Sequence, residues 1–124
     1  MTFLDTSVVI DFLAGDEKVI STIKGLAKRD TLKTTAITEY ELLKHGNVLK
    51  REVAEKFLSA VTVCPFDGAA AKQAALLFER LREKGMMINE NDLLIAGVVL
   101  ACGDALLTRD KGFACLDEAN IKII

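Results

Sequence analysis

The chain has 124 residues, of which 51% are hydrophobic, and a formal net charge of −2. This length suits one compact domain spanning residues 1–124. The apolar runs are too short to cross a bilayer, and the first residues lack the basic start and long apolar segment typical of a signal peptide, so we expect a cytoplasmic protein with no membrane partner. A negative net charge disfavours nucleic-acid binding by charge alone, so a polyanionic substrate would require a local basic patch or a bound cation. The odd number and wide spacing of the three cysteines argue against a disulfide framework and against a zinc finger.

Two periodicities alternate along the chain, one typical of strands and one typical of helices. The strand pattern covers residues 2–5, 31–37, 61–64, 105–108 and 121–124. The helical pattern lies between these segments, over residues 7–14, 16–29, 38–46, 47–60, 68–84 and 89–102. Strands that alternate with helices indicate the α/β class, with a central, mainly parallel sheet of about four to five strands and helices on both faces.

Two of the predicted helices begin with hydroxyl residues that suit a cap. Ser7 or Thr6 can cap the helix that follows the first strand. Thr38-x-x-Glu41 has the spacing of a capping box after the second strand. In both cases a side-chain oxygen would accept a hydrogen bond from a backbone N–H in the first turn.

Four carboxylates occupy positions where an α/β sheet places its ligands. Asp5, Glu41 and Asp110 follow closely on the ends of predicted strands, and the carboxyl ends of parallel strands meet at one edge of the sheet. Asp92 precedes a segment that is apolar on all sides over residues 93–102, which predicts a buried helix whose first turn faces the interior. A carboxylate there is costly to desolvate unless it has a partner such as a metal ion.

Each acid also has a purely structural alternative. Asp5 can cap the next helix or begin a turn, and Asp110 can begin a short helix. Glu41 can complete the capping box, and Asp92 can belong to a helix cap. Glu39 projects from another side of the same turn as Glu41, and the apolar pair that follows Glu41 favours Glu41 as the acid that reaches the site.

The four acids would repel one another if they converged, and a folded protein tolerates this mainly when a divalent cation neutralises them. An all-oxygen set suits Mg²⁺ or Mn²⁺ rather than zinc. The indicated chemistry is metal-assisted hydrolysis of a phosphodiester, by one ion or by two ions about 4 Å apart. His45, the only histidine, is predicted to lie at the exposed end of a helix, which excludes catalysis by a histidine pair.

Four short motifs follow one another along almost the whole chain. They are Phe3-Leu4-Asp5-Thr6-Ser7, Thr35-Ala36-Ile37-Thr38-Glu39-Tyr40-Glu41-Leu42-Leu43-Lys44-His45-Gly46, Asn91-Asp92-Leu93-Leu94-Ile95-Ala96 and Leu107-Thr108-Arg109-Asp110-Lys111-Gly112-Phe113. In their content and order the chain resembles the PIN domain family, and within it the VapC-type toxins of prokaryotic toxin–antitoxin pairs. The resemblance implies a three-layer α/β/α fold and a ribonuclease that depends on Mg²⁺ or Mn²⁺. Gly97 stands where relatives often have alanine, a difference we expect to be harmless within a packed helix.

The resemblance also implies roles for individual residues. Asp5 and Asp92 match the family's main metal ligands, and Glu41 and Asp110 match positions that complete the metal site or orient water. Hydroxyl groups match positions that support these acids, at Thr6, Ser7 and Thr108. The implied partners are a cognate antitoxin protein and a second copy of the chain in a homodimer.

Basic residues beside the acids are the candidates for substrate contact. Arg109 and Lys111 flank Asp110, which makes them the best placed to bind RNA phosphates. The chain has little aromatic surface for base stacking, with one Tyr, six Phe and no Trp. Any sequence preference would then come from RNA shape and from loops.

Other classes of protein share parts of this pattern. A receiver-like phospho-acceptor domain has the same length and alternation, but the predicted strand 61–64 ends without an acceptor Asp. A PIN-like module that binds RNA without cleaving it is disfavoured by the four intact acids. A housekeeping RNA-processing nuclease would keep the same site as a toxin, so it stays an alternative.

Overall fold

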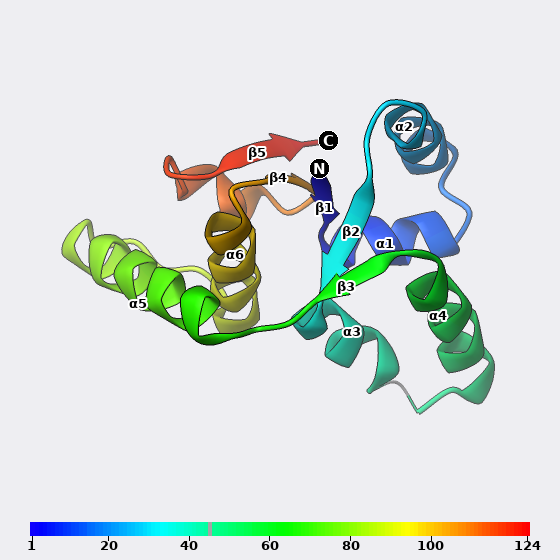
Figure 1. Ribbon diagram of the computed structural model, residues 1–124, viewed down its shortest axis with the longest axis horizontal. Helices are drawn as coiled ribbons and strands as arrows, with labels where there is room; N and C mark the ends of the chain where they lie inside the picture. The colour runs from blue at the N-terminus through cyan, green and yellow to red at the C-terminus, as the bar shows by residue number, and fades with distance from the viewer. Residues whose placement is uncertain (45) are drawn as a thin grey trace.

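The computed structural model describes residues 1–44 and 46–124, and in this part of the chain five strands form one sheet. The strand order is β3-β2-β1-β4-β5, and all neighbouring strands are parallel (Figure 1). The strands are β1 (Thr2–Leu4), β2 (Leu32–Thr35), β3 (Thr62–Cys64), β4 (Ala105–Thr108) and β5 (Asn120–Ile123). The predicted parallel α/β class is confirmed, whereas the exposed helix end predicted at His45 lies outside the described residues.

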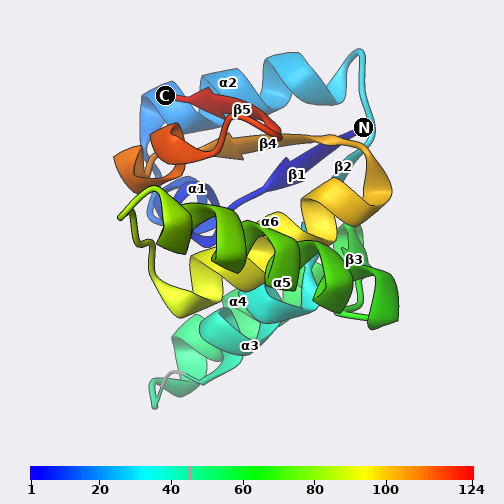
Figure 2. The same cartoon turned by 90° about the vertical axis from the view of Figure 1, so that its left-hand side faces the viewer.

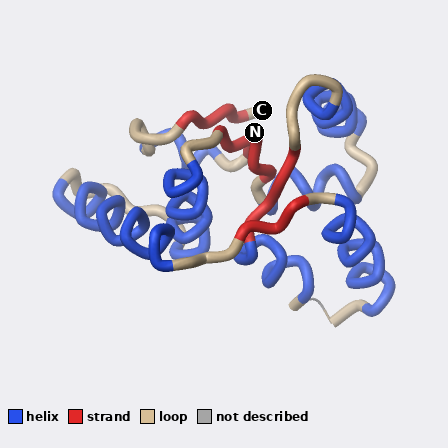
Figure 3. The backbone as a smooth tube through the Cα atoms, viewed as in Figure 1, coloured by secondary structure: helices blue, strands red, loops and turns tan. Residues whose placement is uncertain are grey.

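Helices cover both faces of the sheet and complete three layers (Figures 1 and 3). One face carries α1 (Thr6–Leu13), α2 (Glu17–Ala27), α3 (Ala36–Leu43) and α4 (Val48–Ala60). The other face carries α5 (Gly68–Glu83), α6 (Glu90–Cys102) and the short 3₁₀ helix η1 (Lys111–Cys115). No helix of the described residues combines the length and apolarity needed to cross a membrane.

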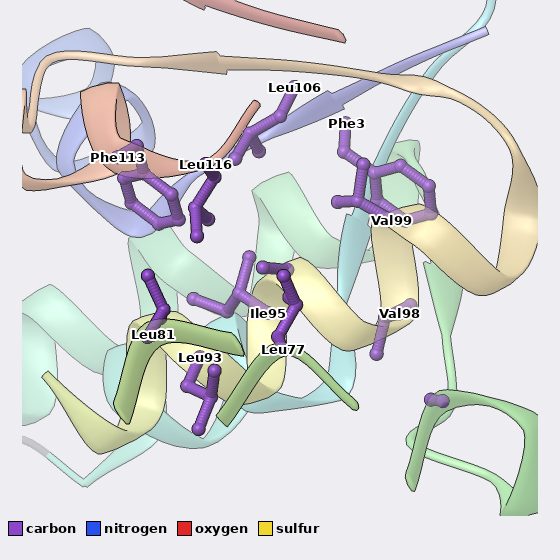
Figure 4. Packing of buried hydrophobic residues seen from close by; sticks show 12 residues of the cluster. Phe3, Leu77, Leu81, Leu93, Ile95, Val98, Val99, Leu106, Phe113 and Leu116 are labelled. Atoms are coloured by element: carbon purple, nitrogen blue, oxygen red, sulfur yellow. The ribbon is translucent and has the colours of Figure 1, made fainter. Parts of the chain in front are cut away.

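Adjacent residues of the central strands divide the core into two halves. Phe3 and Leu106 pack among side chains of α5, α6 and η1, as Figure 4 shows. Leu4 and Leu107 pack on the opposite face among side chains of α1, α2, α3 and α4. Successive side chains of a strand point to opposite faces, and a sheet covered on both faces needs apolar residues at consecutive positions. This is why the short strands read as continuous apolar runs.

Both hydroxyl caps that the sequence predicted are wrong. The first helix begins at Thr6 with Asp5 as its N-cap residue, and no side chain makes the cap bond. Its first amide groups, from Val8 and Val9, bond to the backbone oxygen of Asp5 instead. Thr6 and Ser7 already lie within the first turn of α1, and their hydroxyls donate to the acidic side chains of Glu41 and Asp5.

The second wrong cap changes how Glu41 is understood. The hydroxyl of Thr35 accepts from the backbone N–H of Thr38 at 3.1 Å, so Thr35 ends β2 and caps α3, which begins at Ala36 rather than at Thr38. Glu41 therefore lies well inside α3 and not at the third position of a capping box. The alternative that Glu41 merely completes a capping box with Thr38 is therefore wrong.

The helices α5 and α6 lie side by side and pack closely over one face of the sheet (Figure 2). A Cβ atom on Gly97 would lie 2.7 Å from the backbone oxygen of Ala70 and 2.9 Å from Cβ of Ala74. The glycine is therefore more than a harmless replacement for alanine, because the close approach of the two helices requires it.

We expect Gly97→Ala to lower the free energy of unfolding. Overpacking against the α5 backbone costs about 1–3 kcal/mol, which exceeds the gain of about 1 kcal/mol in helix propensity. Gly25→Ala is the matched control, because a Cβ there meets nothing within 4 Å, and it should stabilise α2 by about 0.5–1 kcal/mol. Urea unfolding of the two variants measures both effects. Equal stability of Gly97→Ala and the wild type would contradict the packing argument.

Candidate active site

The strand order places β1 and β4 side by side at the point where the chain changes direction across the sheet (Figure 1). From β1 the chain moves outward to β2 and β3, and it later returns to the other side of β1 to form β4 and β5. Ligands of open α/β sheets bind beyond the carboxyl ends of the strands at such a switch point. Asp5 follows β1 here, and Asp110 lies two residues beyond the end of β4.

Asp5 is almost completely buried, with 2% of its surface exposed. Its Oδ2 accepts hydrogen bonds from the hydroxyls of Thr108 at 2.7 Å and Ser7 at 2.8 Å. Its Oδ1 is also buried and has no hydrogen-bond partner among the described residues. Burial raises the pKa of Asp5, and the hydrogen bonds from Thr108 and Ser7 oppose this rise. A buried carboxylate oxygen without a partner is unfavourable unless a ligand supplies the missing positive charge.

Glu41 reaches the site from α3 and is held by residues from two other helices. The hydroxyl of Thr6 donates to Oε1 of Glu41 at 2.7 Å and lies 2.9 Å from the hydroxyl of the buried Thr38. Asn91 of α6 donates from Nδ2 to Oε2 at 3.4 Å. Neither Thr38 nor Asn91 was predicted from the sequence as a site residue. Their only sequence signals are their positions next to the two acidic motifs.

Asp92 lies in the first turn of α6 and is partly exposed. Its pKa is raised to about 7, first because the carboxyl is desolvated and then because of the negative charge of Asp5. A hydrogen bond with Asp110 and the charges of Asp110 and Glu41 raise the pKa of Asp92 further. The charges of Asp5, Asp110 and Glu41 all act on Asp92, so the structure places the four predicted carboxylates near one another.

The donor set of this acidic site fits a hard divalent cation. It consists of carboxylate oxygens, one of them buried without a partner, and carboxylates and carbonyls suit Mg²⁺ or Mn²⁺. Within residues 1–44 and 46–124, no three acidic, histidine or cysteine side chains form a ready-made metal cage. Mg²⁺ needs no such cage, because it keeps several waters and binds through about one or two carboxylates. Asp5 and Asp92 could supply those, with Glu41 and Asp110 beside them.

The two basic candidates differ in their surroundings. The guanidinium of Arg109 lies against Asp16 and Asp11, with Nη1 2.9 Å and 3.2 Å from their Oδ2 atoms. Lys111 begins η1 and is exposed. The ion pairs of Arg109 could not be predicted from the sequence, because nothing local to Asp11 or Asp16 indicates a partner about a hundred residues away.

An apolar groove lies apart from the acids and is not the candidate site. It runs along α1, α3 and α4, and its lining residues are Ile10, Leu13, Ala14, Leu42, Leu49, Lys50, Val53 and Ala54. Lys50 is the one charged side chain in that lining, so the groove holds no pair of groups suited to acid–base or metal chemistry.

The protein is thus a three-layer α/β/α protein with a group of acidic side chains at the switch point of its parallel sheet. The PIN domain family matches residues 2–119. The chain belongs to this family, as its motifs indicated, and the receiver-like alternative is therefore wrong.

Similar proteins agree with this assignment. Ribonuclease VapC3 of Methanocaldococcus jannaschii is 30% identical over 95 residues, which cover 77% of this chain and 94% of that protein. VapBC-5 of Mycobacterium tuberculosis, a member of the VapBC family of toxin–antitoxin systems, has a TM-score of 0.70 at 32% identity, covering 99% and 96% of the two chains. VapBC2 of Rickettsia felis bound to promoter DNA has a TM-score of 0.90 at 22% identity, covering 99% and 98%. This last likeness shows the fold alone.

The raised pKa of Asp92 predicts a pH-dependent difference between the wild type and Asp92→Asn without metal. Folding raises the pKa of Asp92 from 3.8 to about 7, so its contribution to stability is full below pH 3.8 and is lost as the pH rises through about 7. Asn cannot ionise. The variant should therefore match the wild type in acid and exceed it at about pH 8, by about 1 kcal/mol after solvent screening of this partly exposed group.

Urea unfolding in EDTA across this pH range measures the difference. Asp67→Asn, the same chemical change at the N-cap of α5, is the control and should not reproduce the divergence. Parallel stability profiles for the wild type and Asp92→Asn would show that the acids do not interact as the structure indicates.

Proposed function

We propose that this chain is a metal-dependent endoribonuclease and the toxin of a VapBC-type toxin–antitoxin pair. The observation that carries the proposal is the meeting of Asp5, Glu41, Asp92 and Asp110 at the switch point of a PIN-family fold. The identity of 30% with a protein named Ribonuclease VapC3 supports RNA as the substrate. The proposed nuclease domain covers residues 1–124.

In this proposal Asp5 and Asp92 are the main ligands of Mg²⁺ or Mn²⁺, and Glu41 and Asp110 complete the site or orient water. When bound, the ion would lower the pKa of an attacking water and stabilise the leaving oxygen of the phosphodiester. The supporting hydroxyls fix the acids, since Ser7 and Thr108 hold Oδ2 of Asp5 and leave Oδ1 without a partner.

Glu41 has a different environment, which suits an orienting role. Thr6 binds one of its carboxylate oxygens and Asn91 the other, so the direction of the side chain is set by α1 and α6. A carboxylate fixed in this way can accept a hydrogen bond from a water in a defined position. Groups that orient a metal site in this manner typically change metal affinity or activity by about 10- to 100-fold when removed.

Substrate and partners follow from the same assignment. Lys111 is exposed beside Asp110 and is the proposed contact to RNA phosphates, with Arg109 as the second candidate. VapBC-5, at 32% identity, belongs to a toxin–antitoxin family, which supports a cognate antitoxin as a protein partner. A homodimer and a cytoplasmic location, both expected from the sequence, stay predictions.

Cleavage of a mixed RNA pool tests the proposal directly. Wild type, Asp5→Asn, Asp92→Asn and the control Asp67→Asn are purified identically and assayed with Mg²⁺, with Mn²⁺ and with EDTA. We expect metal-dependent cleavage by the wild type and the control. Loss of one preorganised electrostatic contact typically lowers rates at least about a hundredfold, and we expect this for both site variants.

Two results would change the conclusion. Equal cleavage by the wild type and Asp92→Asn, or cleavage in EDTA, would point to a contaminating nuclease, and the non-catalytic RNA-binding alternative would replace the enzyme. Metal-dependent cleavage without growth arrest on expression would retain the nuclease and favour the housekeeping alternative over the toxin.

A further inference from the structure

Arg109 connects the candidate site to a part of the chain that contributes no acid to it. It lies between Thr108, the last residue of β4, and Asp110. Its Nη1 is 2.9 Å from Oδ2 of Asp16 and 3.2 Å from Oδ2 of Asp11. Asp11 belongs to α1 and Asp16 precedes α2, so one guanidinium nitrogen binds the segment that joins these two helices.

The backbone of Arg109 is anchored to the same helix as its side chain. Its N–H donates to the hydroxyl of Ser7 at 3.1 Å, and Ser7 in turn donates to Oδ2 of Asp5. Arg109 is therefore bound at its backbone by the start of α1 and at its side chain by the end of α1 and the start of α2. Movement of residue 109 relative to α1 is restricted at two separate points.

The neighbours of Arg109 make the hydrogen bonds that shape the site. The hydroxyl of Thr108 donates to Asp5 at 2.7 Å and accepts from the backbone N–H of Asp110 at 3.0 Å. Oδ1 of Asp110 accepts from the backbone N–H of Gly112 at 2.8 Å. Because residues 108–110 are consecutive, a shift of Arg109 displaces both a partner of Asp5 and the carboxylate of Asp110.

The charges show that Arg109 is already neutralised where it stands. Two carboxylates face its single positive charge, and its side chain is 29% exposed. Partly exposed ion pairs add little to global stability, so the pairs are better suited to fixing a local geometry. An RNA phosphate would have to displace two carboxylates from this guanidinium, whereas Lys111 is exposed to solvent.

We infer that Arg109, held by Asp11 and Asp16, is a positioning residue that fixes the turn carrying Asp110 and thereby aligns the acidic site. The inference rests on the proposed nuclease function for its kinetic consequence. Its structural consequence, an ordered turn at residues 108–112, is independent of that function. Functional groups must be held within about 0.5 Å to act together, which is the precision that such a support provides.

The test removes the two carboxylates and leaves Arg109 in place. In Asp16→Asn the amide oxygen can still accept from the backbone N–H of Val19, so the cap of α2 remains while its charge is lost. Asp11→Asn is the equivalent change on α1, and the double variant removes both negative charges that hold the guanidinium. Arg109→Ala removes the same ion pairs by deleting the guanidinium. Asp67→Asn at the N-cap of α5 is the control.

Kinetics on RNA separate positioning from substrate binding. We expect Asp11→Asn/Asp16→Asn and Arg109→Ala each to lower kcat by about 10- to 100-fold with KM unchanged. Combining all three substitutions should cause no further loss, because the residues act as one unit. If Arg109 instead binds RNA phosphates, the carboxylate variants would keep kcat and keep or lower KM, and Arg109→Ala alone would raise KM. That outcome would overturn the inference.

Two readouts do not require RNA cleavage. Amide hydrogen exchange should become faster at Asp110 and Gly112 in the carboxylate variants, because the N–H groups of both residues donate within the turn. The affinity for Mn²⁺, measured by titration calorimetry, should fall by about tenfold in the same variants. Unchanged exchange and unchanged Mn²⁺ affinity would refute the inference even if the wild type cleaves RNA.

The same readouts separate the inference from the proposed function. Suppose that the wild type cuts no RNA, but that Asp11→Asn/Asp16→Asn exchanges the amide hydrogens of the turn faster and binds Mn²⁺ more weakly than the wild type. This result would refute the nuclease function and support the positioning role. If the double variant does not fold by circular dichroism, Asp11→Asn alone replaces it, since that carboxylate caps no helix.

Discussion

Asp5 lies at the carboxyl end of a central strand, and its carboxylate is almost completely removed from water. One of its oxygens receives two hydroxyl hydrogen bonds, and the other has no partner among the described residues. Burying a charge in this way opposes folding unless a counter-charge is supplied. The surrounding structure maintains this unfavourable position, which is what a protein does at a functional site and avoids elsewhere.

The parallel sheet and a group of hydroxyls together maintain the position. Consecutive apolar residues hold β1 and β4 between two helical layers, so the ends of these strands are rigid. Four hydroxyls then connect Asp5, Glu41 and the turn after β4, namely those of Thr6, Ser7, Thr38 and Thr108. Hydroxyls can both donate and accept, so they link carboxylates to backbone without adding charge. The acids can therefore be fixed in place while their mutual repulsion remains for a cation to relieve.

Positive charge near the acids is directed away from them. Arg109 is the sequence neighbour of Asp110, yet its guanidinium pairs with Asp11 and Asp16. Had it turned toward the four acids, it would have neutralised the charge that favours a divalent ion. This arrangement also agrees with a net charge of −2 in a protein proposed to act on RNA. Attraction of a polyanion then depends on the bound ion and on exposed residues such as Lys111.

The sequence by itself determined the alternation of strands and helices and the parallel sheet, because apolar periodicity and strand ends are local features. It also singled out the four acids, whose roles stay predictions. It also predicted where the α2, α5 and α6 helices begin, since Asp16, Asp67 and Asn89 each cap the turn that follows them. Only the tertiary structure decided the cap of α3 at Thr35, the partners of Arg109 and the need for glycine at position 97. These features depend on segments far apart in the chain, whose contacts no local pattern records.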